Sequence, residues 1–233
     1  MKRLVPPAAI AVSLLACLAV APHNAMAQTS EDQQVWVNLT AMGSVKDRLV
    51  YFAEVQPRSG DGVDRLDQLL LRGAVGLKLS PALTVYQGFA HVIVPRDGAR
   101  DVNEERSFQQ ISWQIAKPWG GELSGRTRFE QRWRSDGDDM GLRLRQMIRF
   151  EKPLRPDAKG PNALLWTEPF IALNDTDWGA RAGFDRVRSF GGLELPLGGA
   201  ATAEIGYLNE YINQTAGRSR MNHIASITLF FRH

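Results

Sequence analysis

Charged and apolar residues alternate along two neighbouring segments in the middle of the chain. Every even position from 126 to 134 is Arg or Glu, and the positions between them are Thr127, Phe129, Gln131 and Trp133. In 142–151 the parity is reversed. Side chains alternate faces along a strand, whereas a helix would scatter these charges around its axis. Because the residues between the segments are turn-forming, the pattern predicts a β-hairpin with one charged face and one apolar face.

Similar alternation recurs along much of the chain, and turn-forming residues separate the segments. In 183–195 we place Arg186, Arg188 and Glu194 on one face together with Phe184 and Phe190. Many segments exceed the roughly 5–6 residues typical of globular strands and reach the roughly 9–11 needed to cross a bilayer. The predicted strands are 35–42, 48–57, 66–78, 82–94, 105–116, 121–134, 140–152, 163–173, 183–195, 200–212 and 220–232.

The predicted connections alternate between tight turns and longer polar loops. Tight turns fall at 80–81, 117–120 and 195–199, whereas 58–65, 95–103, 135–139, 174–181 and 213–219 are longer; 152–162 is long where the alternation requires a short turn. Short turns at one end and long loops at the other are typical of outer-membrane barrels. We therefore predict an all-β fold, an up-and-down antiparallel transmembrane β-barrel of about ten strands, with twelve as the alternative. Segment 35–42 would pair at the seam or lie inside.

The N-terminal residues indicate export. Lys2 and Arg3 precede an apolar stretch at 6–21, and Ala25-Met26-Ala27 offers the small residues that a signal peptidase requires. We predict a signal peptide at 1–27, cleaved near Ala27, and a single domain at 28–233 in the outer membrane of a Gram-negative bacterium. A membrane anchor and a lipoprotein signal ending at Cys17 are the less favoured alternatives.

Cleavage near Ala27 would change the composition. It removes Cys17, the only cysteine, which excludes disulfide and thiol chemistry from the remainder. It also removes Lys2 and Arg3, so 26 basic residues face 25 acidic ones and the net charge falls from +3 to +1. With no basic block, nucleic acid is not an expected partner.

In a barrel of this size the charged faces would line a narrow lumen. Unpaired buried charges are costly, so carboxylates and guanidinium groups should pair. Such ion pairs could simply rigidify the barrel, or surplus arginines near one mouth could attract a small anionic ligand such as a phosphate or acidic sugar. The predicted lumen cluster is Glu54, Arg126, Arg128, Glu130, Arg132, Arg134, Arg143, Arg145, Arg149, Glu168, Arg186, Arg188, Glu194 and Glu204.

Candidate catalytic chemistry is sparse. Gly-x-Ser-x-Gly is absent, as is a histidine-carboxylate spacing for a metal. His223 and Ser226 are three residues apart, so on one strand they face opposite sides. His91 is the weak candidate for a catalytic base, and we predict no metal and no cofactor. An enzyme that modifies envelope lipids is therefore less favoured than a barrel that has a structural role or that narrowly binds or transports an anionic ligand.

Several of these segments resemble one bacterial outer-membrane family, known only as domain of unknown function 2490. The resemblance would cover nearly all of 35–233, and it implies a small β-barrel without implying an activity. The residues that carry it are Trp36, Arg126-x-Arg128-Phe129-Glu130-Gln131-Arg132, Arg143-x-Arg145, Glu168-Pro169-Phe170, Arg188-x-x-Gly191-Gly192-Leu193 and Gly206-Tyr207.

Two functional classes other than the membrane barrel stay open. One is the lipid-modifying enzyme, and the other is a soluble periplasmic barrel that binds an apolar ligand and has its charged face outside. For the membrane barrel the expected partners are outer-membrane lipid, the barrel-assembly machinery and the small anionic ligand, and we expect a monomer.

Overall fold

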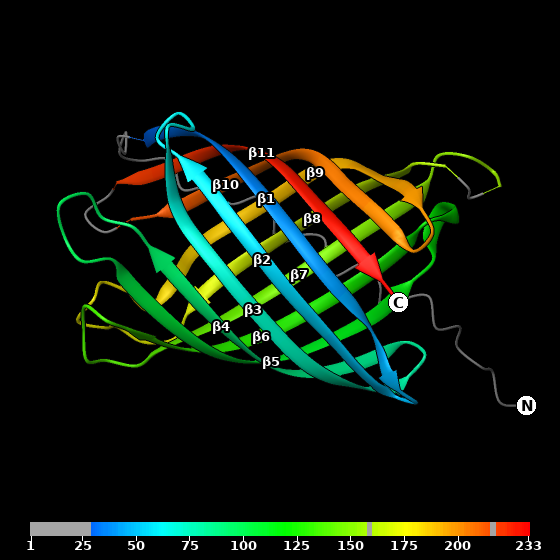
Figure 1. The fold of residues 1–233 in the computed structure, drawn as a ribbon, viewed down its shortest axis with the longest axis horizontal. Coiled ribbons are helices and arrows are strands. Elements are labelled where there is room, and N and C mark those ends of the chain that lie inside the picture. The colour runs from blue at the N-terminus through cyan, green and yellow to red at the C-terminus, as the bar shows by residue number, and fades with distance from the viewer. Residues whose placement is uncertain (1–28, 158–159, 215–217) are drawn as a thin grey trace, which may run out of the picture.

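Eleven strands form one closed barrel in the computed structural model, which describes residues 29–157, 160–214 and 218–233 (Figure 1). One turn of 3-10 helix, η3 (Pro118–Gly120), connects β5 to β6. The strands are β1 (Thr29–Lys46), β2 (Leu49–Gly60), β3 (Arg65–Ser80), β4 (Leu83–Val94), β5 (Val102–Ala116), β6 (Glu122–Arg134), β7 (Gly141–Pro153), β8 (Asn162–Ala172), β9 (Gly183–Gly198), β10 (Ala201–Asn213) and β11 (Ser219–Arg232).

The predicted all-β barrel is confirmed, and each of the eleven predicted segments corresponds to one strand. The strand number lies between the expected ten and the alternative twelve. The predicted signal peptide at 1–27 and its cleavage near Ala27 lie outside the described residues.

An odd number of strands makes one neighbouring pair parallel, because strand direction alternates along an up-and-down chain. That pair is β1 and β11, which lie side by side in register from Thr29 opposite Ser219 to Met42 opposite Arg232 (Figure 1). All other neighbouring strands are antiparallel. The predicted segment 35–42 is the middle of β1, so it pairs at the seam.

The two faces of the wall have opposite chemistry. Arg128 and Glu130 on the inner face are only 2% and 1% exposed, whereas Phe89 and Leu165 on the outer face are 53% and 59% exposed. Exposed apolar side chains occur on every strand, among them Leu39, Val55, Val75, Phe89, Ile111, Trp133, Ile148, Leu165, Leu193, Ile205 and Phe231. The barrel is therefore polar inside and apolar outside, the reverse of a soluble protein.

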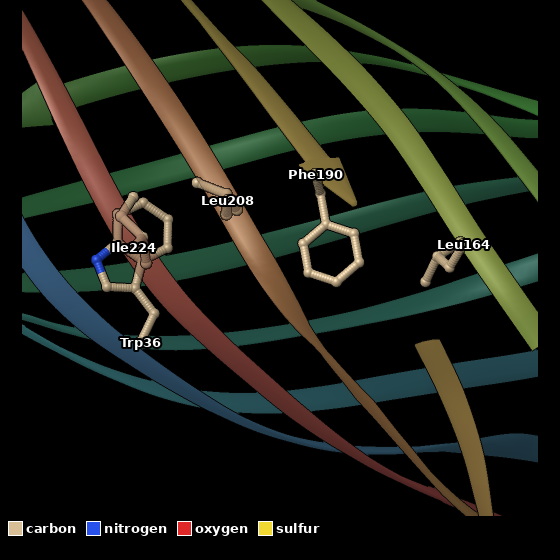
Figure 2. Close-up of a cluster of buried hydrophobic side chains, with 5 residues drawn as sticks. All are labelled: Trp36, Leu164, Phe190, Leu208 and Ile224. Carbon is tan, nitrogen blue, oxygen red and sulfur yellow. The ribbon is translucent and has the colours of Figure 1, made fainter. Parts of the chain in front are cut away.

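One part of the interior is nevertheless apolar. Trp36, Leu164, Phe190, Leu208 and Ile224 point inward from β1, β8, β9, β10 and β11, and form a buried cluster (Figure 2). Burial of large side chains stabilises a fold by about 1.5–3 kcal/mol each. The cluster therefore stabilises the wall on both sides of the β1–β11 seam.

The two ends of the barrel differ in their connections. At one end, residues 47–48, 81–82, 117–121, 154–161 and 199–200 connect the strands, and at the other end 61–64, 95–101, 135–140, 173–182 and 214–218 do so. We call these the tight-turn end and the long-loop end. The chain reaches the tight-turn end again after β11. No helix in the described part of the chain is long and apolar enough to cross a membrane.

Candidate functional site

A network of buried ion pairs crosses the barrel interior between β6, β7 and β8. Glu130 accepts hydrogen bonds from Arg143 at 2.6 Å and from Arg145 at 2.8 Å. Glu168 accepts from Arg145 and from Arg126, each at 2.8 Å. Because each carboxylate meets two guanidinium groups, both acids are held in the charged form inside the barrel.

The network extends toward the long-loop end, where it fills the interior. Glu104 binds Arg106 and Arg132, and Glu210 binds Arg186 and Arg188. Asp185 bridges Arg143 and Arg186. Buried side chains in this half of the barrel are Glu104, Arg132, Arg143, Glu210 and Asn222, each at most 8% exposed. This half of the lumen is therefore closed by paired side chains.

The half of the interior near the tight-turn end is hollow. A cavity of about 810 Å³ opens there and extends inward to the middle of the barrel. Its inner end is lined by Trp36, Arg58, Arg126, Arg128, Arg145 and Arg188. Because the network closes the other half, the cavity is a blind pocket and not a passage.

Among the described residues, two arginines of this pocket lack a close carboxylate: Arg58, which donates only to the amide oxygens of Gln56 and Gln68, and Arg128. Arg128 faces Arg145 directly across the β6–β7 ladder, and like charges in that position repel. Two of its nitrogens donate to the amide oxygen of Gln110, at 2.9 and 2.5 Å, and its guanidinium lies 4.4 Å over the ring of Phe108. Its nearest carboxylate contact is a loose pair with Glu130 at 3.9 Å. Arg128 therefore lacks the charged partner that Arg145 has.

Two buried guanidinium nitrogens in the pocket make no hydrogen bond among the described residues. They are Nη1 of Arg128 and Nε of Arg126. A buried donor left without an acceptor costs about 1–3 kcal/mol, and more when the group is charged. An anionic group that reached these nitrogens from the pocket would supply the missing acceptor.

Positive charge exceeds negative charge around the inner end of the pocket and in the closed half. Ten arginines face six carboxylates there, a difference of four charges. The arginines are Arg58, Arg72, Arg106, Arg126, Arg128, Arg132, Arg143, Arg145, Arg186 and Arg188, and the carboxylates are Glu54, Glu104, Glu130, Glu168, Asp185 and Glu210. The inner part of the lumen therefore carries a formal excess of positive charge.

The balance is reversed near the mouth of the pocket. Arg149 pairs with Glu151 at 2.8 Å and with Glu204 at 2.7 Å, and it approaches Glu194 at 3.7 Å. Arg232 also contacts Glu194, at 3.4 Å. Three carboxylates thus meet two arginines, so the mouth does not repeat the positive excess of the interior.

Every residue of the predicted lumen cluster lies on the inner face. Glu54 pairs with Arg72 from β3, and Arg134 pairs with Asp136 at the long-loop end. Arg126, Arg128, Arg145, Arg149, Glu168, Arg188, Glu204 and Glu54 line the pocket; Glu130, Arg132, Arg143 and Arg186 belong to the closed half, and Glu194 lies at the mouth. Of the two arginines with an unsatisfied nitrogen, Arg128 is buried at 2% exposure, whereas the side chain of Arg126, four residues from the tight-turn end of β6, is 26% exposed.

The predicted face of Phe184 is wrong. Phe184 is 43% exposed on the outer face and stacks on Tyr211, whereas Arg186 points inward. The register between β8 and β9 shifts here, because Phe170 pairs with Arg186 and Ile171 pairs with Phe184. The extra residue, Asp185, forms a β-bulge that re-aims the side chains after it.

His91 lies outside the lumen. Its side chain faces outward from β4 and its Nδ1 is 2.6 Å from Oε1 of Glu105 on β5. Both side chains are partly exposed, at 33% and 43%. Within the described residues there is no group of three or more His, Cys, Asp or Glu side chains that could hold a metal ion.

Sequence analysis missed several interior charges. Arg58 was assigned to a loop because β2 continues to Gly60, three residues beyond its predicted end. Arg72 directly follows Leu69, Leu70 and Leu71, which occupy both faces of the strand and hide the alternation there. Glu104 precedes the predicted start of its strand, and Glu210 shares the parity of Glu204, a signal that could have located it.

Comparison with known proteins places the chain in a family without an assigned activity. The model of a protein family of unknown function, DUF2490, matches residues 33–222. An uncharacterised protein of Methylorubrum extorquens is 53% identical over 219 residues, which is 93% of this chain and 95% of that protein. No solved structure matches the chain. The chain therefore belongs to the DUF2490 family of proteins of unknown function.

Proposed function

We propose that this protein is an outer-membrane β-barrel whose blind lumen binds a small anionic ligand. The apolar outer face supports the membrane location. Exposed large apolar side chains on all eleven strands would be costly in water but favourable in lipid. Barrel closure satisfies the backbone of every strand, which the bilayer requires.

The charged inner face argues against the soluble alternative. A soluble periplasmic barrel with an apolar ligand would have its charged face in water. Here Arg128, Glu130 and Glu168 are at most 2% exposed, while Phe89 and Leu165 are more than half exposed.

Orientation follows from the connections. In outer-membrane barrels the short turns face the periplasm and the longer loops face outward. The pocket opens at the tight-turn end, so in this orientation it receives its ligand from the periplasm. The ion-pair network closes the side toward the cell exterior.

The unpartnered nitrogens of Arg126 and Arg128 carry the proposal of anion binding. Ion pairing alone would explain arginines whose donors are all satisfied, as at Arg145. It does not explain a buried guanidinium beside a cavity whose Nη1 makes no hydrogen bond among the described residues and which faces a like charge. A carboxylate or phosphate at that point would accept a charge-assisted hydrogen bond and offset the repulsion.

The location is tested by cell fractionation together with gel migration before and after heating. The expected result is recovery in the outer-membrane fraction and a folded band that shifts on heating. Recovery in the soluble periplasmic fraction would overturn the membrane assignment.

Anion binding is tested with acetate and inorganic phosphate. A ligand that binds only the native state raises the unfolding temperature. We expect stabilisation of the wild type at constant ionic strength, and none in Arg128→Gln. Arg134→Gln is the matched control, because Arg134 lies on the inner face of the same strand but outside the pocket. Equal stabilisation of all three proteins would exclude the site.

A further inference from the structure

The pocket has an apolar wall that anion binding alone does not use. Close to its mouth, one side is formed by Met42 on β1, Phe52 on β2, Tyr86 on β4 and Phe230 on β11. Met42 and Phe52 are opposite each other across the β1–β2 ladder. All four side chains line the same cavity as Arg126 and Arg128, so apolar surface and cationic groups face one space.

Aromatic contacts connect this wall to the unpartnered arginine. The rings of Tyr86 and Phe52 meet edge to face, with centroids 5.7 Å apart. Phe52 stacks on Phe108 at 6.3 Å, and Phe108 carries the guanidinium of Arg128 at 4.4 Å. The apolar wall therefore leads inward and ends at the cationic group that lacks a partner.

The backbone makes room for this wall. Gly76 on β3 lies beneath Tyr86, and a Cβ at Gly76 would be 2.6 Å from the ring atom Cε1 of Tyr86. A larger residue at 76 would push the ring away. The position of Tyr86 therefore depends on the glycine, which indicates that the wall is a defined part of the fold.

A purely polar anion would leave the wall in contact with water. An anion with an apolar chain would satisfy the guanidinium groups and cover the wall at once, and each methylene group buried would raise affinity about fourfold. The cavity, at about 810 Å³, falls in the range of roughly 300–1,000 Å³ that accommodates such molecules.

We infer that the ligand is a single-chain amphipathic anion, bound with its carboxylate or phosphate head at Arg126 and Arg128 and its apolar chain along Met42, Phe52 and Phe230 toward the mouth. This inference rests on the proposed anion-binding function and specifies the class of ligand. The head enters first, because the arginines lie at the inner end of the pocket and the apolar wall lies near the opening.

The test measures equilibrium binding to the full chain in lipid nanodiscs, with empty nanodiscs subtracted to remove partition into lipid. The probes are acetate, butanoate, hexanoate and octanoate, with octyl phosphate for the alternative head group and octan-1-ol as the neutral analogue. Affinity should rise at least tenfold from acetate to octanoate or octyl phosphate. Octan-1-ol should bind at least tenfold more weakly than octanoate.

Variants separate the head site from the apolar wall. Arg128→Gln should weaken acetate and octanoate alike, by at least tenfold. Phe52→Ser and, independently, Met42→Gln should weaken octanoate by at least fivefold and leave acetate unchanged. Phe89→Ser is the matched control, since Phe89 faces outward. Gel migration before and after heating shows which variants are folded.

Three outcomes would each exclude the amphipathic ligand, the anion site or both. If acetate and octanoate bind equally and Arg128→Gln weakens both, the anion site stands and the amphipathic ligand is excluded. If octan-1-ol binds as well as octanoate, the arginines do not contribute and the pocket is simply apolar. If no anion binds, the proposed function fails, and this inference fails with it.

Discussion

At the scale of single residues, arginines in nearly the same place have different surroundings. Arg145 donates to Glu130 and to Glu168, each at 2.8 Å. Arg128 opposite it donates to the amide of Gln110, lies over the ring of Phe108 and comes no closer than 3.9 Å to a carboxylate, that of Glu130. Removing one member of a complete buried pair leaves a charge without compensation. Removing Arg128, which has no close carboxylate, leaves no such charge.

Glu130→Gln should lower the free energy of unfolding by about 3–5 kcal/mol, because Arg143 and Arg145 would lose a shared buried carboxylate. Urea unfolding in lipid vesicles measures this. Glu122→Gln is the control. Glu122 lies on the same strand but is half exposed, and its ion pair with Lys117 is loose, at 4.0 Å. Equal losses in the two variants would show that the network does not contribute to stability.

Arg145→Met should lower the free energy of unfolding by about 3 kcal/mol or more, and Arg128→Met by less than about 1 kcal/mol. Only the first substitution takes a donor away from two buried carboxylates, Glu130 and Glu168. The same unfolding measurement distinguishes them. If Arg128→Met lowered the free energy of unfolding more than Arg145→Met, Arg128 would be a structural residue and would no longer support a ligand site.

The alternation of charged and apolar residues in the sequence was enough to place the lumen residues on one face, because successive side chains of a strand point to opposite faces. The alternation could not show which arginines form ion pairs with carboxylates. The partner of Arg126 is Glu168, which is 42 residues away and lies on β8, one strand beyond the neighbouring β7. The alternation also failed at Phe184, where the bulge at Asp185 changes which face the side chains take.

At the scale of elements, the β9–β10 pair depends on two glycines that belong to the family-like segments of the sequence. Gly192 and Gly206 are opposite each other, and the ring of Phe190 lies 2.7 Å from where each Cβ would be. Phe190 in turn stacks on Trp166 at 5.4 Å. The glycines therefore allow an aromatic ring to lie flat against the inner wall.

Gly206→Ala should destabilise the barrel by about 1–3 kcal/mol, because the new methyl group would clash with the carbonyl oxygen of Gly191 and with Phe190. Thermal unfolding followed by gel migration tests this. Gly73→Ala is the control, since its Cβ would meet only the carbonyl oxygen of Phe52, at 3.8 Å. A neutral Gly206→Ala would contradict the packing described for Phe190.

Two loops at the long-loop end hold each other through a carboxylate. Asp177 accepts hydrogen bonds from the backbone N–H groups of Asp138 and Asp139, at 2.8 and 3.2 Å, and Trp178 donates to the carbonyl oxygen of Asp139 at 2.7 Å. The hydrogen bond from Asp138, followed by that from Asp139, holds the pKa of Asp177 below its ordinary value. The ionised carboxylate therefore stabilises the loop contact.

Because the folded pKa of Asp177 is lowered, this stabilisation is complete above the ordinary value near 3.9 and is lost as the pH falls through the folded value. The amide resonances of Asp138 and Asp139 should titrate together as the pH falls below the ordinary value of an aspartate. Asp177→Asn should abolish that titration. Persistence of the titration in the variant would assign it to another carboxylate.

The order and approximate limits of the strands could be predicted because each strand is long and its turns are polar. Which strands close the barrel, and whether they run parallel, could not be predicted. Pairing of β1 with β11 joins residues about as far apart in the chain as the fold allows, and no local pattern reports it. The strand count was uncertain for the same reason, because nothing in 35–42 shows whether it joins the wall.

At the scale of the whole molecule, the barrel is closed at one end and hollow at the other. Eight strands enclose just enough room for side chains, and open porins need about 16–18. Eleven strands leave some excess volume, and long arginine side chains take up the half near the long loops. The remaining half is the pocket of about 810 Å³.

Wild-type protein should therefore be electrically silent in planar bilayers, because the ion-pair network leaves no continuous water path. Insertion is verified in the same preparation by the heat-dependent gel shift, and protein-free lipid provides the baseline. Discrete, reproducible conductance steps from the folded band would show that the network opens, and the lumen would then be a channel instead of a binding pocket.

The parallel seam also separates the two ends of the folded chain. β1 starts at the rim with the long loops and β11 finishes at the opposite rim (Figure 1). An even-stranded barrel would start and finish on the same side. In the proposed orientation, the residues around Thr29 face the cell surface, on the opposite side of the bilayer from the end of β11. An epitope inserted before Thr29 would then be accessible to antibody on intact cells, while one fused after His233 would be accessible only once the outer membrane is broken.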